Sequence, residues 1–228
     1  MRKLVIIYGP PRSAASLLLK ALLAHPEITG YTVEGGVGGS DENPLLDCFD
    51  IGNTTELDRL WNEVSPIPGQ YLALKAPGYC FAYEYFNTLS NYECKYIGVG
   101  RDPYEVVDSM LNHDISRSVL GIVIDGTDCP KDKTDFLRAR WDAGNEYQRA
   151  LMRYRWHVDN IAKEQQESGI MLTPYHIRND GKKMAKSIEA YLGLTPWSGF
   201  ANELSKFYHR KISASRREEI KAKLGENI

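Results

Sequence analysis

The sequence predicts an α/β fold with three layers, in which helices cover both faces of a central parallel sheet. Short apolar runs alternate with helical patterns along the chain, and this alternation is typical of parallel strands joined by crossover helices. The runs are almost continuously apolar, as expected for strands that are buried on both faces. Polar loops follow three of the runs directly, at the sheet edge where ligands bind in such folds.

Four strands are expected, each a short apolar run that ends in a turn: residues 3–8, 70–75, 95–100 and 169–176. Helical patterns lie between and after the strands. They cover residues 16–24, 79–89, 104–112, 135–167 (with a break), 181–192 and 214–224. Two irregular stretches, residues 30–53 and 115–134, are interpreted as long surface segments that recognise a substrate.

Composition limits the class of protein. The 228 residues, of which 43% are hydrophobic, suit one domain over residues 1–228. The net charge of −2 argues against a uniformly basic nucleic-acid-binding protein. No apolar run is long enough for a signal peptide or a membrane span. We therefore expect a cytoplasmic protein.

The cysteines support a reducing compartment. Their spacing is wide and irregular, and no C-x-x-C pair suggests a zinc or redox site. They are Cys48, Cys80, Cys94 and Cys129. We expect free thiols and no bound metal.

The loop after the first strand reads GPPRSAAS, from Gly9 to Ser16, and leads directly into a helical pattern. A phosphate-binding loop has the pattern G-x-x-x-x-G-K-[ST]. Gly9 and Ser16 fit this pattern, whereas Ala14 and Ala15 stand at the positions of its second glycine and its lysine. The loop therefore keeps the frame of a phosphate site but lacks the lysine of a kinase.

Arg12 supplies a cation within the same loop. The N–H groups and the dipole of a helix N-terminus attract anions, and a guanidinium binds a phosphate or a sulfonate in a bidentate manner. The hydroxyls of Ser13 and Ser16 are further donors. In the alternative interpretation, Arg12 pairs with a surface carboxylate and the serines cap the helix.

Two other loops end at the same predicted edge. Lys75 closes the second strand, and Arg101 follows the third strand, with Ser109 about two helical turns further along. Arg101 and Ser109 could hold an anion that extends along this helix. Alternatively, Arg101 pairs with Asp102 or Asp108, Ser109 is a packing residue and Lys75 is a surface lysine.

Taken together, these motifs resemble those of sulfotransferases that use 3′-phosphoadenosine 5′-phosphosulfate. The first loop is similar to the family element GxPRSGTS, and Arg101, Asp102, Pro103 and Ser109 match RDPxxxxxS in register. Further similarities are LLAHPEI after the first loop, LALKAP around Lys75 and SIEAYLGL near residue 190. The matches occur in the family's order and span most of the chain.

The resemblance implies a fold like that of P-loop nucleotide hydrolases, and transfer of a sulfonate to a hydroxyl or amine without a metal. Arg12 would contact the 5′-phosphosulfate, and Arg101 with Ser109 would hold the 3′-phosphate. Arg210 and Lys211 are the nearest match to the family's basic C-terminal loop. The full set of cofactor-binding residues implied is Pro11, Arg12, Ser13, Ala14, Ala15, Ser16, Arg101, Ser109, Arg210 and Lys211.

The first loop departs from the family pattern, which has Gly-Thr in place of Ala14-Ala15. Alanine disfavours positive φ, so we expect residue 14 to have a helical or extended backbone. Loss of the threonine hydroxyl removes a hydrogen bond worth about 1–3 kcal/mol when it is charge-assisted. Ser16 is expected to compensate.

Transfer also requires a base for the acceptor proton and a cation for the leaving group. Glu34, in YTVEGG, is the first candidate for the base, because parts of the family have a glutamate at a comparable place. His113 is the second, and the pKa of histidine suits proton transfer near neutral pH. Arg12 and Lys75 are the candidate cations, and a structural role is expected for His25.

Two other functions remain open at this point. One is a small-molecule kinase of the same architecture, and the other is a non-catalytic relative that binds a nucleotide. The aromatic residues of the 79–86 run are expected to pack in the core, although one ring could stack on adenine. The acceptor is expected to be a small molecule, a sugar or a lipid-like compound, and the sequence does not predict the oligomeric state.

Overall fold

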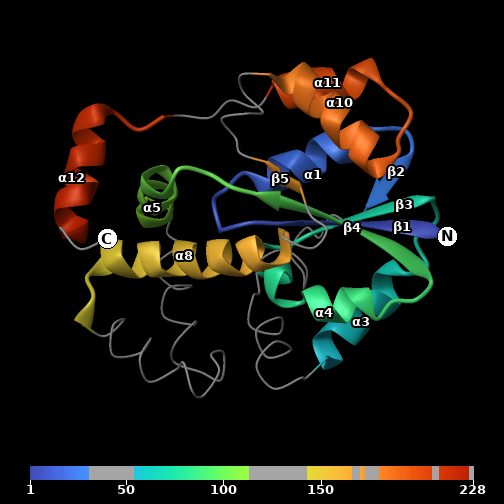
Figure 1. The fold of residues 1–228 in the computed structure, drawn as a ribbon, viewed down its shortest axis with the longest axis horizontal. Coiled ribbons are helices and arrows are strands. Elements are labelled where there is room, and N and C mark those ends of the chain that lie inside the picture. Colours follow the sequence, from blue (N-terminus) through green and yellow to red (C-terminus); the bar gives the residue numbers. More distant parts are fainter. Residues whose placement is uncertain (31–53, 113–142, 166–169, 173–179, 207–210, 226–228) are drawn as a thin grey trace.

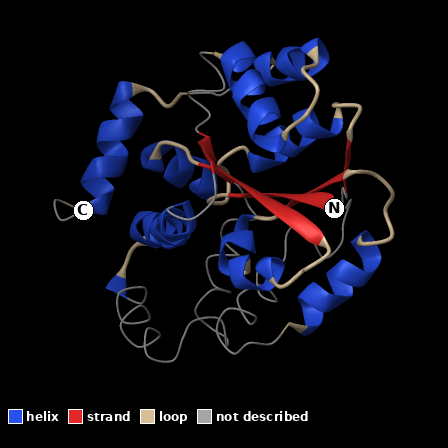
Figure 2. Cartoon of the chain, turned by 45° about the vertical axis from the view of Figure 1, so that its right-hand side comes forward, coloured by secondary structure: helices blue, strands red, loops and turns tan. Residues whose placement is uncertain are grey.

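The structure is a computed structural model that describes residues 1–30, 54–112, 143–165, 170–172, 180–206 and 211–225. Helices lie above and below a central sheet (Figure 1), and the sheet is seen between them from a second direction in Figure 2. The predicted α/β class with three layers is confirmed. Its physical basis is the set of short apolar runs that the sequence places between helical patterns.

Within the described residues, the sheet has five strands in the order β2-β3-β1-β4-β5, and every pairing among them is parallel. The strands are β1 (Arg2–Tyr8), β2 (Ile28–Gly30), β3 (Tyr71–Lys75), β4 (Tyr92–Val99) and β5 (Ile170–Leu172). Four of them match the predicted runs. β2 was not predicted, because three residues are too few to show a hydrophobic pattern.

The central strand explains why the sheet is buried. Residues Leu4 to Tyr8 are all 0% exposed, as expected for a strand with helices on both faces. Successive side chains point to opposite faces. Val5 and Ile7 therefore join one core cluster, whereas Leu4 and Ile6 join the other.

Each face of the sheet has its own helical layer (Figure 1). One cluster joins the sheet to α1 (Ala15–Leu23), α10 (Gly181–Leu192) and α11 (Ser198–Ser205). The other joins it to α3 (Thr55–Val64), the 3₁₀ helix η1 (Pro77–Phe81), α4 (Tyr83–Asn87) and part of α8 (Glu146–Gln165). The sequence did not predict α3 or α11.

A third cluster lies beyond the carboxyl ends of the strands (Figure 1). It joins α5 (Pro103–Leu111) and the first half of α8 to α12 (Ala214–Leu224). The buried side chains of α12 are Ile220 and Leu224. This small core holds the C-terminal helix against the loop that follows β4, which is one of the predicted ligand loops.

The aromatic run after β3 belongs to the core. Tyr79 and Phe86 are 2% and 1% exposed, and their ring centroids are 5.2 Å apart in an edge-to-face arrangement. The expected single helix over 79–89 is wrong, because the chain forms η1 and then α4, with Ala82 at φ −108° between them. The two rings pack edge-to-face in the core and are not available to a ligand.

His25 also has a structural role. Its ring is 1% exposed and lies edge-on to Trp197 and Phe200. Nδ1 accepts a hydrogen bond from the Glu27 N–H at 3.2 Å, and Nε2 lies 3.0 Å from the Thr195 carbonyl oxygen. The imidazole therefore ties the end of α1 to the segment between α10 and α11.

The packing of α1 predicts unequal effects of two leucine substitutions. Leu22 is 0% exposed and Leu17 is 42% exposed on the same helix. Leu22→Ala should lower the free energy of unfolding by about 2–5 kcal/mol, because it leaves a cavity under the sheet. Leu17→Ala should change it by less than about 0.5 kcal/mol. Urea unfolding of both variants tests this, and equal losses would contradict the assignment of the buried face.

Candidate functional site

The loops after β1 and β4 leave the sheet side by side. These strands are parallel neighbours, with Tyr8 in register with Gly98. The chain then continues from β1 toward β2 and from β4 toward β5, which lie on opposite sides of the sheet. Divergent loops of this kind form the crevice at which parallel sheets bind ligands.

Gly9 allows the two loops to approach closely. A Cβ atom at this position would lie 2.3 Å from the Val99 carbonyl oxygen and 2.7 Å from Ser13 Oγ. Both distances are far below van der Waals contact. Any side chain at residue 9 would therefore push the first loop away from β4.

The rest of the first loop contains two non-glycine residues with a left-handed backbone. Arg12 has φ 69° and Ala14 has φ 80°. The expectation of a helical or extended Ala14 is wrong, because this residue is the N-cap of α1 in the left-handed region. Its carbonyl accepts hydrogen bonds from the N–H groups of Leu17 and Leu18 at 3.0 and 3.2 Å, so the strained residue begins the helix.

Ser13 carries a buried hydroxyl at the start of this helix. Its side chain is 1% exposed, and its Oγ atom has no hydrogen-bond partner among the described residues. A buried hydroxyl is normally hydrogen-bonded. Alanine at residue 14 has no side-chain oxygen to cap the first N–H groups of α1. The loop therefore offers unused donors at a helix N-terminus, as an anion site requires.

Arg12, Arg101 and Ser109 meet above this loop. Arg12 Nε donates to Ser109 Oγ at 3.2 Å. Arg101 Nη1 donates to the Arg12 carbonyl oxygen at 2.8 Å. Three residues chosen from two separate sequence motifs are thus joined by direct hydrogen bonds.

Both the side chain and the backbone of Arg101 are held by neighbouring residues. Its Nε lies 3.4 Å from Glu105 Oε2, and the two side chains are only 11% and 8% exposed. The Tyr154 hydroxyl donates to the Arg101 carbonyl oxygen at 2.8 Å. Burial lowers the pKa of Arg101, and Glu105 opposes this shift, so the guanidinium stays charged.

The N-terminus of α5 sets the direction of its polar side chains. The Asp102 carboxylate accepts from the N–H groups of Tyr104 and Glu105, both at 3.1 Å, which is a helix N-cap. Its other oxygen accepts from Arg217 Nη2 at 2.8 Å. The alternative prediction that Arg101 pairs with Asp102 or Asp108 is wrong, since its ion pair is with Glu105.

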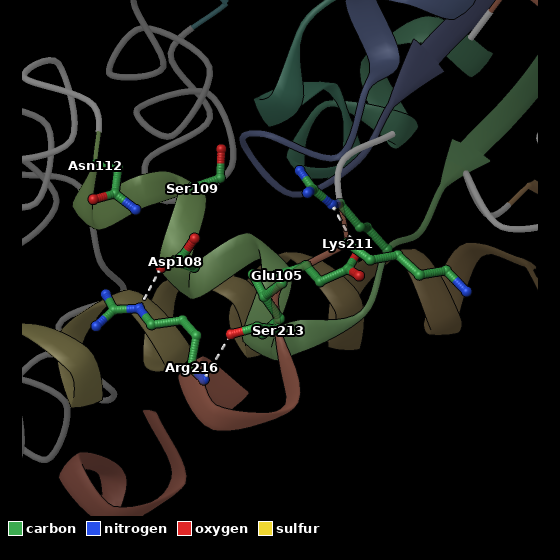
Figure 3. Close-up of a pocket in the computed structure, with 9 residues that line it drawn as sticks. Glu105, Asp108, Ser109, Asn112, Lys211, Ser213 and Arg216 are labelled. Carbon is green, nitrogen blue, oxygen red and sulfur yellow. Dashed lines mark hydrogen bonds and ion pairs between the residues drawn. The ribbon is translucent and has the colours of Figure 1, made fainter. Parts of the chain in front are cut away.

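A cavity of about 700 Å³ is lined in part by Arg101. Figure 3 shows it beside Glu105 and Asp108 of α5. Its lining combines α5 with the start of α12 and the residues that precede this helix. The lining residues are Arg101, Glu105, Asp108, Ser109, Asn112, Lys211, Ile212, Ser213 and Arg216. The C-terminal segment therefore contributes two cations, Lys211 and Arg216, to the site formed by the predicted Arg101 and Ser109.

The other predicted residues occupy varied positions. Lys75 ends β3 in register with Ile7 of β1, at the same edge of the sheet. Pro11 lies in the first loop, Ala15 is buried in the first turn of α1, and Ser16 is exposed beside it. Glu34, His113 and Arg210 lie outside the described residues, so their roles stay predictions.

The sequence interpretation missed Arg216 and Glu105, and it considered Asp108 only as a partner of Arg101. One signal pointed to Arg216. Arg216 and Arg217 stand in the first turn of a helix, where the helix dipole disfavours cations. Two arginines at this position indicate carboxylates supplied by another part of the chain, and the structure provides Asp108 and Asp102.

Two features are absent from the part of the chain that the structure describes. Within these ranges, no group of three or more His, Cys, Asp or Glu side chains is placed to hold a metal ion. None of the helices in the same ranges combines the length and apolar character needed to cross a membrane.

No protein-family model and no curated protein sequence matches the chain. Solved structures do match it. A sulfotransferase from Alicyclobacillus acidocaldarius is 14% identical, with a TM-score of 0.56 over 98% of this chain and 92% of that one. The chain has the sulfotransferase fold.

Two further structures share this fold. The sulfotransferase domain from the curacin biosynthetic pathway is 13% identical, with a TM-score of 0.55 over 88% of this chain and 77% of that domain. The sulfotransferase domain of the Synechococcus PCC 7002 olefin synthase is 14% identical, with a TM-score of 0.53 over 96% of this chain and 87% of that domain. The predicted fold and the resemblance on which it rested are thereby confirmed.

The left-handed backbone of Ala14 predicts a stabilising substitution. Ala14→Gly should raise the free energy of unfolding by about 0.5–1 kcal/mol, because it removes the steric cost of positive φ. The greater conformational entropy of glycine in the unfolded chain offsets only part of this gain. Ala15→Gly, one residue further into α1, should instead lower it by about 0.5–1 kcal/mol. Thermal unfolding of the two variants tests the backbone assignment, and destabilisation by both would contradict it.

Proposed function

We propose that the protein is a sulfotransferase that moves a sulfonate from 3′-phosphoadenosine 5′-phosphosulfate to a hydroxyl or amine. The observation that supports this most is the meeting of Arg12, Arg101 and Ser109 at the carboxyl edge of the sheet. Arg12 and Arg101 come from the loops of two neighbouring strands, and Ser109 lies on α5. Together with the N-terminus of α1, they provide two adjoining anion sites, as a nucleotide with phosphates at both ends requires.

The residues present fit this donor. Ser13 has a buried hydroxyl with no partner among the described residues. Because Gly9 has no side chain, the backbone of the loop can approach the end of β4 closely. Arg101 and Ser109 line the cavity of about 700 Å³ together with Lys211. We assign the α1 end to the 5′-phosphosulfate and the cavity to the 3′-phosphate.

The donor, when bound, supplies a sulfonate and a phosphate leaving group. Arg12 stabilises negative charge at the α1 end of the site, because its exposed guanidinium bonds to Ser109 through Nε and carries two further nitrogens that can donate to an anion. Lys75, at the end of the neighbouring β3, is the second cation of this site. Glu34 takes the acceptor proton, and His113 is the alternative base.

A kinase is disfavoured by the first turn of α1. Ala15 stands at the position of the lysine that holds the outer phosphates of ATP in P-loop enzymes. The cation of this loop is Arg12, which lies earlier in the turn.

The acceptor is proposed to be a small molecule, a sugar or a lipid-like compound. A cytoplasmic location is supported by the wide and irregular spacing of the cysteines, which include no C-x-x-C pair.

Binding of 3′-phosphoadenosine 5′-phosphate tests the proposal. The protein should bind this nucleotide in calorimetry. Ser109→Ala and Arg12→Ala should each weaken binding by about tenfold or more, because each removes a hydrogen bond to a charged group. Arg59→Ala is the matched control, since Arg59 is exposed on α3 and pairs with Glu63. Absence of binding to the unmodified protein, or magnesium-dependent ATP turnover, would overturn the assignment.

The identity of the base has its own test. The pH profile of kcat/KM should lose its acidic limb in Glu34→Gln and keep it in His113→Asn, because a base must be deprotonated to accept the acceptor proton. Binding of the nucleotide by both variants shows that the donor site is intact. The reverse pattern would assign the base to His113.

A further inference from the structure

Two carboxylates line the cavity that we assign to the 3′-phosphate. Glu105 and Asp108 both lie on α5 (Figure 3). Glu105 pairs with Arg101, which precedes the same helix. Asp108 instead pairs with Arg216 of α12, whose Nε lies 2.7 Å from Asp108 Oδ1. A carboxylate at this place would repel a phosphate unless a cation neutralises it.

Arg216 is held firmly in place. Its Nη1 lies 2.6 Å from Glu219 Oε1, and its guanidinium carbon lies 5.9 Å from the centre of the Tyr147 ring. Its backbone N–H donates to the hydroxyl of Ser213, the N-cap of α12, at 3.1 Å. The Arg216 and Asp108 side chains are 27% and 20% exposed, so solvent screens this ion pair only in part.

We propose that Arg216 is a positioning residue that makes the site selective for nucleotides with a 3′-phosphate. It acts by neutralising Asp108 and by adding a third cation to the cavity. This inference rests on the proposed function. It assigns the C-terminal helix α12 a direct part in donor recognition, because α12 supplies the charge that Asp108 would otherwise leave uncompensated.

The charges of the lining residues set a specific order of affinities. The lining has three cations, Arg101, Lys211 and Arg216, and two carboxylates, Glu105 and Asp108. Glu219 also pairs with Arg216. Arg216→Gln removes one positive charge from this set, whereas Asp108→Asn removes one negative charge. The double variant restores the original balance without the ion pair.

The experiment is a double-mutant cycle on the full chain, read by calorimetry with 3′-phosphoadenosine 5′-phosphate and with adenosine 5′-phosphate. Arg216→Gln should weaken binding of the first nucleotide by about tenfold, which corresponds to roughly 1.4 kcal/mol, and leave binding of the second almost unchanged. Asp108→Asn should strengthen binding of the first. The double variant should return close to the unmodified protein, and Arg216→Lys should retain most of the affinity.

Two controls separate charge from structure. Lys223→Gln removes the same charge from the exposed last turn of α12 and should change neither affinity. Thermal unfolding shows whether α12 remains docked. If the double variant binds as weakly as Arg216→Gln, or if both nucleotides weaken equally, the selectivity role is wrong. Failure of the unmodified protein to bind either nucleotide would instead overturn the proposed function.

Discussion

The parallel pairing of β1 with β4 is the constraint on which the site depends. Because the two strands run in the same direction and in register from Arg2–Tyr92 to Tyr8–Gly98, their loops emerge next to each other. Gly9 then brings the first loop against the Val99 carbonyl oxygen. The hydrogen bond from Arg101 to the Arg12 carbonyl oxygen follows from this approach. A different neighbour for β1 would separate the two guanidinium groups.

The same arrangement concentrates positive charge and requires carboxylates to balance it. Arg12 and Arg101 lie close enough for their charges to interact, and this repulsion contributes to the lowered pKa of Arg101, although burial is the larger cause. Glu105, whose Oε2 lies 3.4 Å from Arg101 Nε, opposes this lowering of the pKa but does not cancel it. Asp102 at the N-cap of α5 and Asp108 within this helix pair with Arg217 and Arg216, so the polar face of α5 also docks α12. One helix therefore serves both the candidate site and the C-terminal packing.

The strands, helix starts and site residues that could be predicted from the sequence are each marked by a pattern of neighbouring residues. The apolar runs gave four of the five strands, and the capping residues Asp180 and Ser213 mark the starts of α10 and α12. The loop motifs gave Arg12, Arg101 and Ser109. The remainder depends on tertiary contacts. Nothing in the local sequence shows that α12 packs on α5, so the role of Arg216 in the cavity could not be deduced, and β2 is too short to recognise.

The backbone of the first loop explains how this loop keeps its shape without the glycine and lysine of a phosphate-binding loop. A non-glycine residue in the left-handed region costs about 1–2 kcal/mol, and it persists only where the surroundings determine the conformation. Here β1 ends against Val99, and α1 begins at once with its Ala14 carbonyl bonded to two N–H groups. The short turn between these fixed ends imposes positive φ on Arg12 and Ala14. The two fixed ends of the loop thus determine its backbone shape. The glycine and the lysine are not needed for this shape, and Arg12 supplies a cation within the turn, where its Nε donates to Ser109.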